Sequence, residues 1–407
     1  MIGILTFYWA DDYGAMLQSY ALKTYLNQYG GAVLVPYFPR ALRGRYRVIH
    51  YNRADSIPRR LYKMAGQLRP KNLRRAFKRR KRMKEFRREF LTGERKNLNS
   101  SKDIFKYKSG IDIYVAGSDQ VWNPEITEGF QEGYFCTFRK WKKSGARYAA
   151  YAASIGMERL NEKYDRKLAG LLSNFDVISI REPLSKPYIA KQWGKEPEVV
   201  LDPVFLLKKK EWEVLSGKLT KEAVRHMIYG ADGAFSGNTA VNSGRGYIAV
   251  YDTEYSPEMA QYLRKLEKDS GLAVAVISAV HKTYRWTEKE KRLVGLGPLE
   301  FLGVLQHAAY VVTNSFHGTA FSIILKKQFA AFPHSTRGAR MLDILRTARL
   351  DDRLVSGEKR EVRIDEKIDW DEVDKALEKE ITHSKAFIQN EILTPPEGTG
   401  RRACPCR

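Results

Sequence analysis

The segment that decides the fold opens the chain: Ile2-Gly-Ile-Leu-Thr-Phe-Tyr8, Asp11-Asp12-Tyr13-Gly14, a helical pattern up to Leu26, Gly30-Gly31, and Ala32-Val-Leu-Val35. The first run is short, apolar and rich in β-branched residues, which predicts a buried strand. After the polar loop, apolar residues recur at helical spacing until the glycine pair, where a second strand-like run begins. Strand, helix and strand in this order predict a βαβ unit.

The same alternation returns twice further along the chain. Apolar, strand-like runs lie at 111–115, 148–154, 176–180 and 199–201; the run 148–154 ends at Gly156, and the other three end in polar residues. A second series predicts strands at 247–251, 272–277, 310–313 and 329–332, with helices at 257–268, 299–307 and 316–326. Such alternation favours mostly parallel sheets, so we predict an α/β fold with two Rossmann-like domains facing a cleft.

Four parts of the chain are expected: an N-terminal Rossmann-like domain (1–205, with a basic insert at about 40–100), a C-terminal Rossmann-like domain (206–355), a terminal helix (356–393) and a disordered tail (394–407). The terminal helix is amphipathic and is introduced by Asp369 or Asp371. Residues 230–244 are rich in Gly, Ser and Asn without periodicity and are expected to form a flexible loop near the domain junction, within an inserted loop from about 221 to 246.

Charge is concentrated in one segment. The 407 residues carry 71 Lys+Arg against 47 Asp+Glu, a formal charge of +24, and the stretch from Arg40 to Lys96 holds 22 of the basic residues and only four acids. Within it, apolar residues from Leu73 to Phe90 punctuate the cations and predict a helix with a cationic face. One interpretation is a solvated helix against the first domain; the other is contact of 40–96 with an anionic membrane surface or a lipid-linked polyanionic glycan. Nucleic acid is disfavoured because no nucleic-acid motif accompanies the charge.

Several classes of protein are disfavoured by what the sequence lacks. Three cysteines make no disulfide framework, no apolar run approaches the roughly 18 residues of a membrane span, and the first ten residues lack a basic leader. We therefore expect a cytoplasmic protein, peripheral at most at the inner face of the membrane. Dinucleotide, P-loop, nucleophile-elbow and zinc motifs are absent, and Cys404-Pro-Cys406 alone makes a poor metal site, so no metal is expected.

Four polar clusters follow predicted strands, where ligands bind in open α/β sheets: Asp11-Asp12-Tyr13-Gly14, Gly117-Ser118-Asp119-Gln120, Arg181-Glu182-Pro183-Leu184-Ser185, and Asn314-Ser315-Phe316-His317-Gly318-Thr319. If both sheets face one cleft, these clusters converge there. Each has a structural alternative: Asp12 can cap the first helix, and Asp119 can cap a turn.

Two residues of these clusters point more strongly to ligand binding. Arg181 directly follows a buried strand pattern, a costly position unless an anion or a carboxylate meets the guanidinium. Ser315 is the expected N-cap of a helix, so His317 lies in its first turn beside free backbone N–H groups. That setting suits a phosphate together with a proton-transfer group.

As an ordered set, the following segments resemble the polysaccharide pyruvyl transferase family: Gly3–Phe7, Tyr13–Leu22, Val115–Pro124, Ser179–Glu182, Val200–Pro203, Gly297–Leu302, Tyr310–Ala320 and Arg340–Leu345. The resemblance covers roughly residues 1–392 and is weaker over the basic segment and over 221–246. It implies two Rossmann-like domains similar to GT-B glycosyltransferases. It also implies transfer of pyruvate from phosphoenolpyruvate to two hydroxyls of a sugar as a ketal, in exopolysaccharide biosynthesis.

The resemblance also implies roles for the clusters. His317 would be the acid/base or phosphate contact, Asp119 a sugar contact or base, and Arg181 the anchor of the donor's phosphate or carboxylate. Further substrate contacts would be Asp12, Tyr13, Gly14, Ser118, Gln120, Asn314, Ser315, Phe316 and Gly318. Phosphoenolpyruvate would be a donor substrate, no cofactor is implied, and the acceptor would be a lipid-linked or nucleotide-linked glycan.

One residue departs from the family pattern, and two other functions stay open. Asp12 stands where the family usually has Asn, and its charge would repel an anionic donor, so either it faces the sugar hydroxyls or the donor differs. The alternatives are a nucleotide-sugar glycosyltransferase on the same frame and a non-catalytic protein that binds an anionic glycan or lipid.

Overall fold

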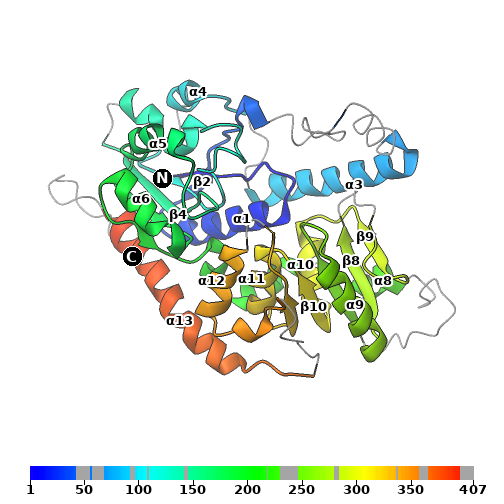
Figure 1. The fold of residues 1–407 in the computed structure, drawn as a ribbon. Helices are drawn as coiled ribbons and strands as arrows, with labels where there is room; N and C mark the ends of the chain where they lie inside the picture. The colour runs from blue at the N-terminus through cyan, green and yellow to red at the C-terminus, as the bar shows by residue number, and fades with distance from the viewer. Residues whose placement is uncertain are drawn as a thin grey trace.

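The computed structural model describes residues 1–42, 56, 68–91, 97–107, 110–141, 145–217, 219–229, 246–278, 284–335, 338–356 and 365–394. Two parallel sheets flanked by helices dominate it (Figure 1). The first sheet has the order β2-β1-β3-β4-β5-β6, with β1 Ile2–Leu5, β2 Ala32–Leu34, β3 Ile113–Ala116, β4 Arg147–Ala153, β5 Val177–Ile180 and β6 Glu198–Val199. The second has the order β11-β10-β7-β8-β9, with β7 Tyr247–Tyr251, β8 Ala273–Ser278, β9 Lys291–Val294, β10 Tyr310–Thr313 and β11 Phe329–Ala331.

Helices connect these strands in the predicted alternation. They are α1 Tyr13–Asn27, α3 Pro70–Phe86, α4 Ser101–Lys106, α5 Asp165–Leu172, α6 Lys186–Trp193, α7 Lys209–Ser216, α8 Lys221–Tyr229, α9 Pro257–Ser270, α10 Pro298–His307, α11 Phe316–Ile324, α12 Ala339–Thr347 and α13 Trp370–Phe387. Central strands such as β1, β7 and β10 are buried along their whole length, as strands covered on both faces must be. The predicted α/β fold with two parallel sheets and a C-terminal helix is confirmed.

The elements differ from the prediction mainly at the sheet edges. Strand β9, Lys-Arg-Leu-Val, was not predicted because only Leu293 of its side chains is buried and two of its four residues are charged. It pairs with β8 alone in the sheet order, and charged residues are typical of such an edge. The expected loop over 221–246 is wrong at its start, because Lys221–Tyr229 form helix α8, whose apolar residues Val224, Ile228 and Tyr229 are buried. Residues 230–245 and 395–407 lie outside the described residues, and the predicted domain boundaries themselves stay a prediction.

Helix α13 begins as predicted and returns the chain to the first domain (Figure 1). Asp369 is its N-cap and accepts hydrogen bonds from the backbone N–H groups of Asp371 and Glu372. Near its other end, the Ser384 hydroxyl accepts a hydrogen bond of 2.9 Å from the N–H of Leu201. No helix in the described part of the chain is long and apolar enough to cross a membrane.

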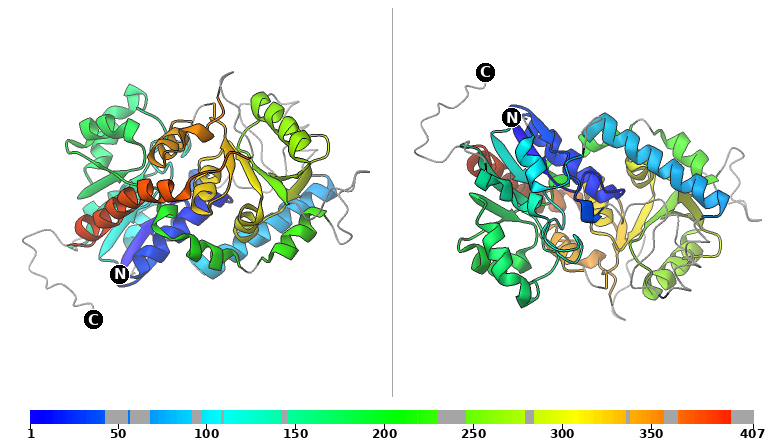
Figure 2. Two further views of the ribbon diagram at one scale, coloured as in Figure 1. Left: turned by 90° about the horizontal axis from the view of Figure 1, so that it is seen from below. Right: turned by 90° about the horizontal axis from the view of Figure 1, so that it is seen from above.

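The cationic helix α3 contacts both domains rather than the first alone. Arg79 donates to the Asp11 carbonyl at 2.8 Å, while Arg82 donates to the Gly295 carbonyl at 3.0 Å and pairs with Glu300 at 3.0 Å. Figure 2 shows α3, in light blue, with one end beside α1 and the other beside the second domain. Three segments of the predicted basic insert lie outside the described residues: 43–55, 57–67 and 92–96.

Tyr13 is a second link between the domains. Its ring, at the start of α1, is stacked on Phe301 of α10 with the centroids 4.7 Å apart and the planes 8° apart. Its hydroxyl donates to the Leu296 carbonyl at 3.1 Å. We expect Tyr13→Phe to lower the free energy of unfolding by about 1 kcal/mol, because the buried bond is lost while the stacking remains. Chemical denaturation measures this, with Tyr255→Phe, an exposed tyrosine, as the control; equal midpoints for the two variants would contradict the assignment.

Candidate active site

The carboxylate of Asp202 joins the carboxyl edges of the two sheets. Its Oδ2 accepts a hydrogen bond from the Ser118 hydroxyl at 3.0 Å and one from Nη1 of Arg181 at 2.7 Å. Nε2 of His317 lies 3.8 Å from the same oxygen. Ser118 follows β3, Arg181 follows β5 and Asp202 follows β6, while His317 stands in the first turn of α11 in the other domain. The predicted convergence of the second, third and fourth polar clusters is therefore observed.

Local backbone structure fixes this carboxylate. Asp202 caps the short 3₁₀ helix Pro203–Leu206, and its Oδ1 accepts from the Val204 N–H at 3.1 Å. Oδ1 thus binds the backbone, and Oδ2 binds the side chains of the site. The side chain has no exposed surface, so its charge is compensated by protein groups rather than water.

Arg181 is held between two carboxylates. Besides Asp202, it meets Glu182, whose Oε1 accepts from Nε of Arg181 at 3.2 Å and from the Ser154 hydroxyl at 2.6 Å. The guanidinium carbon lies 5.0 Å from the centre of the Phe316 ring. Nη2 of Arg181 and Oε2 of Glu182 are buried and have no hydrogen-bond partner among the described residues. The sequence argument that this arginine needs an anion is met by carboxylates, and one donor remains for a ligand.

His317 is positioned by the absence of a side chain at Gly14. A Cβ placed on Gly14 would lie 2.0 Å from Nδ1 of His317, so the imidazole rests on the first turn of α1. Its own helix, α11, begins after Ser315, which is the N-cap by backbone conformation but makes no side-chain capping bond. As at the start of any α-helix, the first N–H groups of α11 have no acceptor within the helix.

Burial and neighbouring charges shift the pKa values of His317 and Asp202. Burial lowers the pKa of His317, against the opposing effect of Asp202 and Asp119, so the imidazole is neutral near pH 7. For Asp202, burial would raise the pKa, but His317, Arg181 and the Val204 N–H hold it below its usual range. The pKa of Arg181 stays raised despite its burial because Glu182, Asp202 and Asp119 surround it. A neutral imidazole beside an ionised carboxylate can accept a proton and be stabilised afterwards.

Asp119 and Asp12 both satisfy backbone groups. Asp119 has a left-handed φ of 82°, and its Oδ1 accepts from the next residue's N–H, that of Gln120, at 2.8 Å. Asp12 is the N-cap of α1 and accepts from the Ala15 N–H at 2.9 Å. The structural alternatives for both residues are therefore observed. Both carboxylates nevertheless act on the pKa of His317, which places them within electrostatic reach of the imidazole.

Other predicted site residues build the framework around this centre. Gln120 accepts from the Asn123 amide at 2.8 Å, and Asn314 binds the backbone after β7 through Thr253 N–H and the Glu254 carbonyl, both at 2.8 Å. Gly318 packs against Thr313, where a Cβ would lie 2.2 Å from the hydroxyl. The Tyr13 hydroxyl is bound to a backbone carbonyl, as described above. Their roles as substrate contacts stay predictions.

Three residues of the centre were not assigned from the sequence. Glu182 comes directly after Arg181, and Asp202 follows β6 beyond Val200 and Leu201. Both lie near strand ends, as the other clusters do, so that signal was present. Arg340 comes from α12, and its Nε lies 4.0 Å from Oε1 of Glu182. Arg340 opens the Arg340–Leu345 segment that resembles the family, but no pattern within α12 indicates its contact with Glu182, which lies far away in the sequence.

The described residues contain no group of three His, Cys, Asp or Glu side chains that would hold a metal ion. Cys136 is buried as a free thiol, and burial raises its pKa, so it is a structural residue. Cys404 and Cys406 lie outside the described residues. The chemistry of the candidate site is that of an imidazole, carboxylates and guanidinium groups.

A family model described as polysaccharide pyruvyl transferase matches residues 12–336. Among curated proteins, none matches the chain significantly. Solved structures with a similar arrangement include UDP-GlcNAc 2-epimerase from Neisseria meningitidis bound to UDP-GlcNAc (9% identity, 97% of this chain and 94% of that one, TM-score 0.46). Others are the Methanocaldococcus jannaschii UDP-GlcNAc 2-epimerase (12%, 93% and 92%, 0.45) and the E. coli ADP-heptose lps heptosyltransferase II (11%, 95% and 99%, 0.34).

The contact between Gly14 and His317 can be tested by a double-mutant cycle. We expect Gly14→Ala to destabilise the protein by about 1–3 kcal/mol, because the new methyl group overlaps the imidazole. In a His317→Ala background the same change should be neutral or slightly stabilising, since alanine favours a helix over glycine. Denaturant titrations of the four proteins give the coupling energy. A cost of Gly14→Ala that is the same in both backgrounds would refute the contact.

The lowered pKa of His317 predicts a pH dependence of stability. Below the usual histidine pKa, His317 binds a proton in the unfolded chain but stays neutral in the folded protein. The free energy of unfolding therefore decreases as the pH is lowered. From about pH 7.5 to about pH 5.5, we expect the wild type to lose more stability than His317→Gln, while carboxylates stay ionised in both. Parallel denaturation curves measure the difference, and identical pH profiles would show that His317 is not buried in neutral form.

Proposed function

Because the chain belongs to the polysaccharide pyruvyl transferase family, we propose that it transfers pyruvate from phosphoenolpyruvate to two hydroxyls of a sugar, as a cyclic ketal. The observation that carries the proposal is the family match over residues 12–336 together with the His317–Asp202–Arg181 centre between the two sheets. The proposed role is the decoration of a cell-surface polysaccharide, an exopolysaccharide or its precursor. The acceptor would be a lipid-linked or nucleotide-linked glycan, and no cofactor is needed beyond the donor substrate.

The proposed reaction makes two C–O bonds and breaks one. Both sugar oxygens bond to the central carbon of phosphoenolpyruvate, and the bond from that carbon to the phosphate oxygen breaks. One hydroxyl proton ends on the methylene carbon, which becomes a methyl group, and the other leaves with the phosphate. The enzyme therefore has to remove protons from oxygen, deliver one to carbon, and stabilise a departing phosphate.

His317 is the proposed proton carrier. Its neutral imidazole accepts a hydroxyl proton, and the resulting cation is stabilised by the Asp202 carboxylate 3.8 Å from Nε2. The same imidazolium then protonates the methylene carbon, so one residue acts first as base and then as acid. Its contact with Gly14 holds the ring in one orientation.

Donor and acceptor are proposed to meet different sides of the centre. The start of α11 and the free Nη2 of Arg181 are the groups available to the phosphate and carboxylate of the donor. The carboxylates of Asp119 and Asp12 would repel those anions, so we assign them to the sugar hydroxyls, with Asp119 as a second base. This assignment also accommodates the charge of Asp12.

The test is phosphate release from phosphoenolpyruvate by the purified protein, with and without lipid-linked and nucleotide-linked glycans. We expect acceptor-dependent release that falls by about 10²–10⁴ in His317→Ala, the usual contribution of a positioned acid or base. His383→Ala is the matched control, because His383 is a half-exposed histidine of α13 paired with Glu198. A wild type that neither releases phosphate nor gains thermal stability from phosphoenolpyruvate would overturn the donor assignment.

A further inference from the structure

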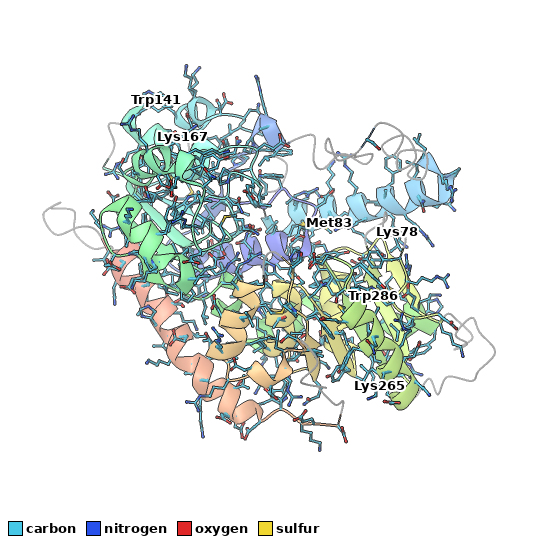
Figure 3. The ribbon with its side chains drawn as sticks, viewed as in Figure 1. Lys78, Met83, Trp141, Lys167, Lys265 and Trp286 are labelled. Carbon is cyan, nitrogen blue, oxygen red and sulfur yellow. The ribbon has the colours of Figure 1, made fainter. Side chains whose placement is uncertain are left out.

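Helix α3 has an inner face that is used by the fold. Arg79 and Arg82 bind backbone carbonyls of the two domains, and Met83 and Phe86 are buried. Figure 3 labels Lys78 and Met83 on the side of the helix turned toward the rest of the chain. Arg79 and Arg82 therefore stabilise the contacts of α3 with the two domains, and the exposed cations of the helix need a separate explanation.

The outer face of α3 carries a stripe formed by Arg74, Phe77, Lys81 and Lys84. Their spacing of three, four and three residues places them within an arc of about 80° on the helix. All four are exposed, Phe77 with 58% of its surface, which is unusual for so large an apolar side chain. Within the described part of the chain, Lys81 has one weak ion pair, with Glu85 at 3.9 Å, and no ion pair involves Arg74 or Lys84. Arg88 extends the cationic surface beyond the helix.

This arrangement is unfavourable to the helix itself. Like charges three or four residues apart destabilise a helix by roughly 0.2–0.5 kcal/mol per pair, and Lys81, Lys84 and Arg88 make two such pairs. Glu85 is the one acid between Pro70 and Phe86. The exposed cations of the outer stripe therefore lower the stability of the helix slightly, and their charge is complementary to an anionic partner.

We propose that the outer stripe of α3 docks on the surface of an anionic phospholipid bilayer. Each exposed cation near such a surface contributes on the order of 1 kcal/mol, and an aromatic ring at the centre of the stripe can enter the headgroup region. A single helix presents a convex surface with one exposed aromatic ring, whereas single-stranded nucleic acids are bound by grooves with several stacking rings. The other phenylalanine of the helix, Phe86, is buried and unavailable for stacking.

The test is co-sedimentation with vesicles of phosphatidylcholine alone or with about 30% phosphatidylglycerol, at low and raised salt. We expect binding to the anionic vesicles only, weakened about a hundredfold in Arg74→Gln/Lys81→Gln/Lys84→Gln and about tenfold in Phe77→Ser. The matched control removes three exposed lysines in and before α13, Lys367→Gln/Lys375→Gln/Lys379→Gln, on the other side of the molecule (Figure 1). All of the substituted side chains are exposed, so all variants should show the thermal transition of the wild type.

The outcomes separate this proposal from the others. Equal loss of binding in both triple variants would mean that net charge, rather than this stripe, attracts the bilayer, and would overturn the proposal. So would a wild type that ignores anionic vesicles, including one that binds RNA or an acidic polysaccharide instead. Because vesicle binding needs no substrate, the result is independent of whether phosphoenolpyruvate is the donor.

Discussion

The centre of this protein depends on one buried carboxylate. Asp202 has no exposed side-chain surface, yet it accepts hydrogen bonds from Ser118 and Arg181 and faces His317 of the other domain. A buried charge of this kind is tolerated only when hydrogen bonds and opposite charge replace water. Groups that follow β3 and β5, together with a histidine of α11, therefore surround one oxygen atom of the residue that follows β6. The charge around His317 thus depends on how the two domains are positioned relative to each other.

The start of α1 provides the second constraint. Within two residues, Tyr13 stacks on Phe301 and binds the Leu296 carbonyl, while Gly14 leaves space for the His317 ring. The first contact requires a large aromatic side chain, and the second requires a residue without a side chain. The sequence Tyr13-Gly14 after the first strand thus contacts the second domain through the tyrosine and leaves space for His317 at the glycine. Two adjacent residues therefore determine much of the geometry of the site.

The sequence predicts local features well and contacts between distant segments poorly. The strand and helix alternation and the Asp369 cap follow from local patterns, and the convergence of the polar clusters follows from the rule that ligands bind at the carboxyl ends of parallel strands. Strand β9 was missed because its charged side chains hide an edge strand, and the contact of Arg82 with Glu300 spans more than 200 residues. The sequence correctly indicated that Arg181 needs a negatively charged partner, but it did not indicate that the partners are Glu182 and Asp202. Pairing across the fold decides which of several acids meets an arginine, and no local pattern carries that information.

The charge of the site is relevant to the proposed role of His317 as base and then as acid. Without donor, burial keeps His317 neutral despite Asp202 and Asp119, and the carboxylates around Arg181 already compensate its charge. An anionic donor beside the imidazole would add negative charge close to Nε2 or Nδ1, which favours the imidazolium and raises its pKa. Proton uptake from the acceptor hydroxyl would then become easier only once the donor is in place. The carboxylates that would repel the proposed donor partly offset the effect of burial on the pKa of His317.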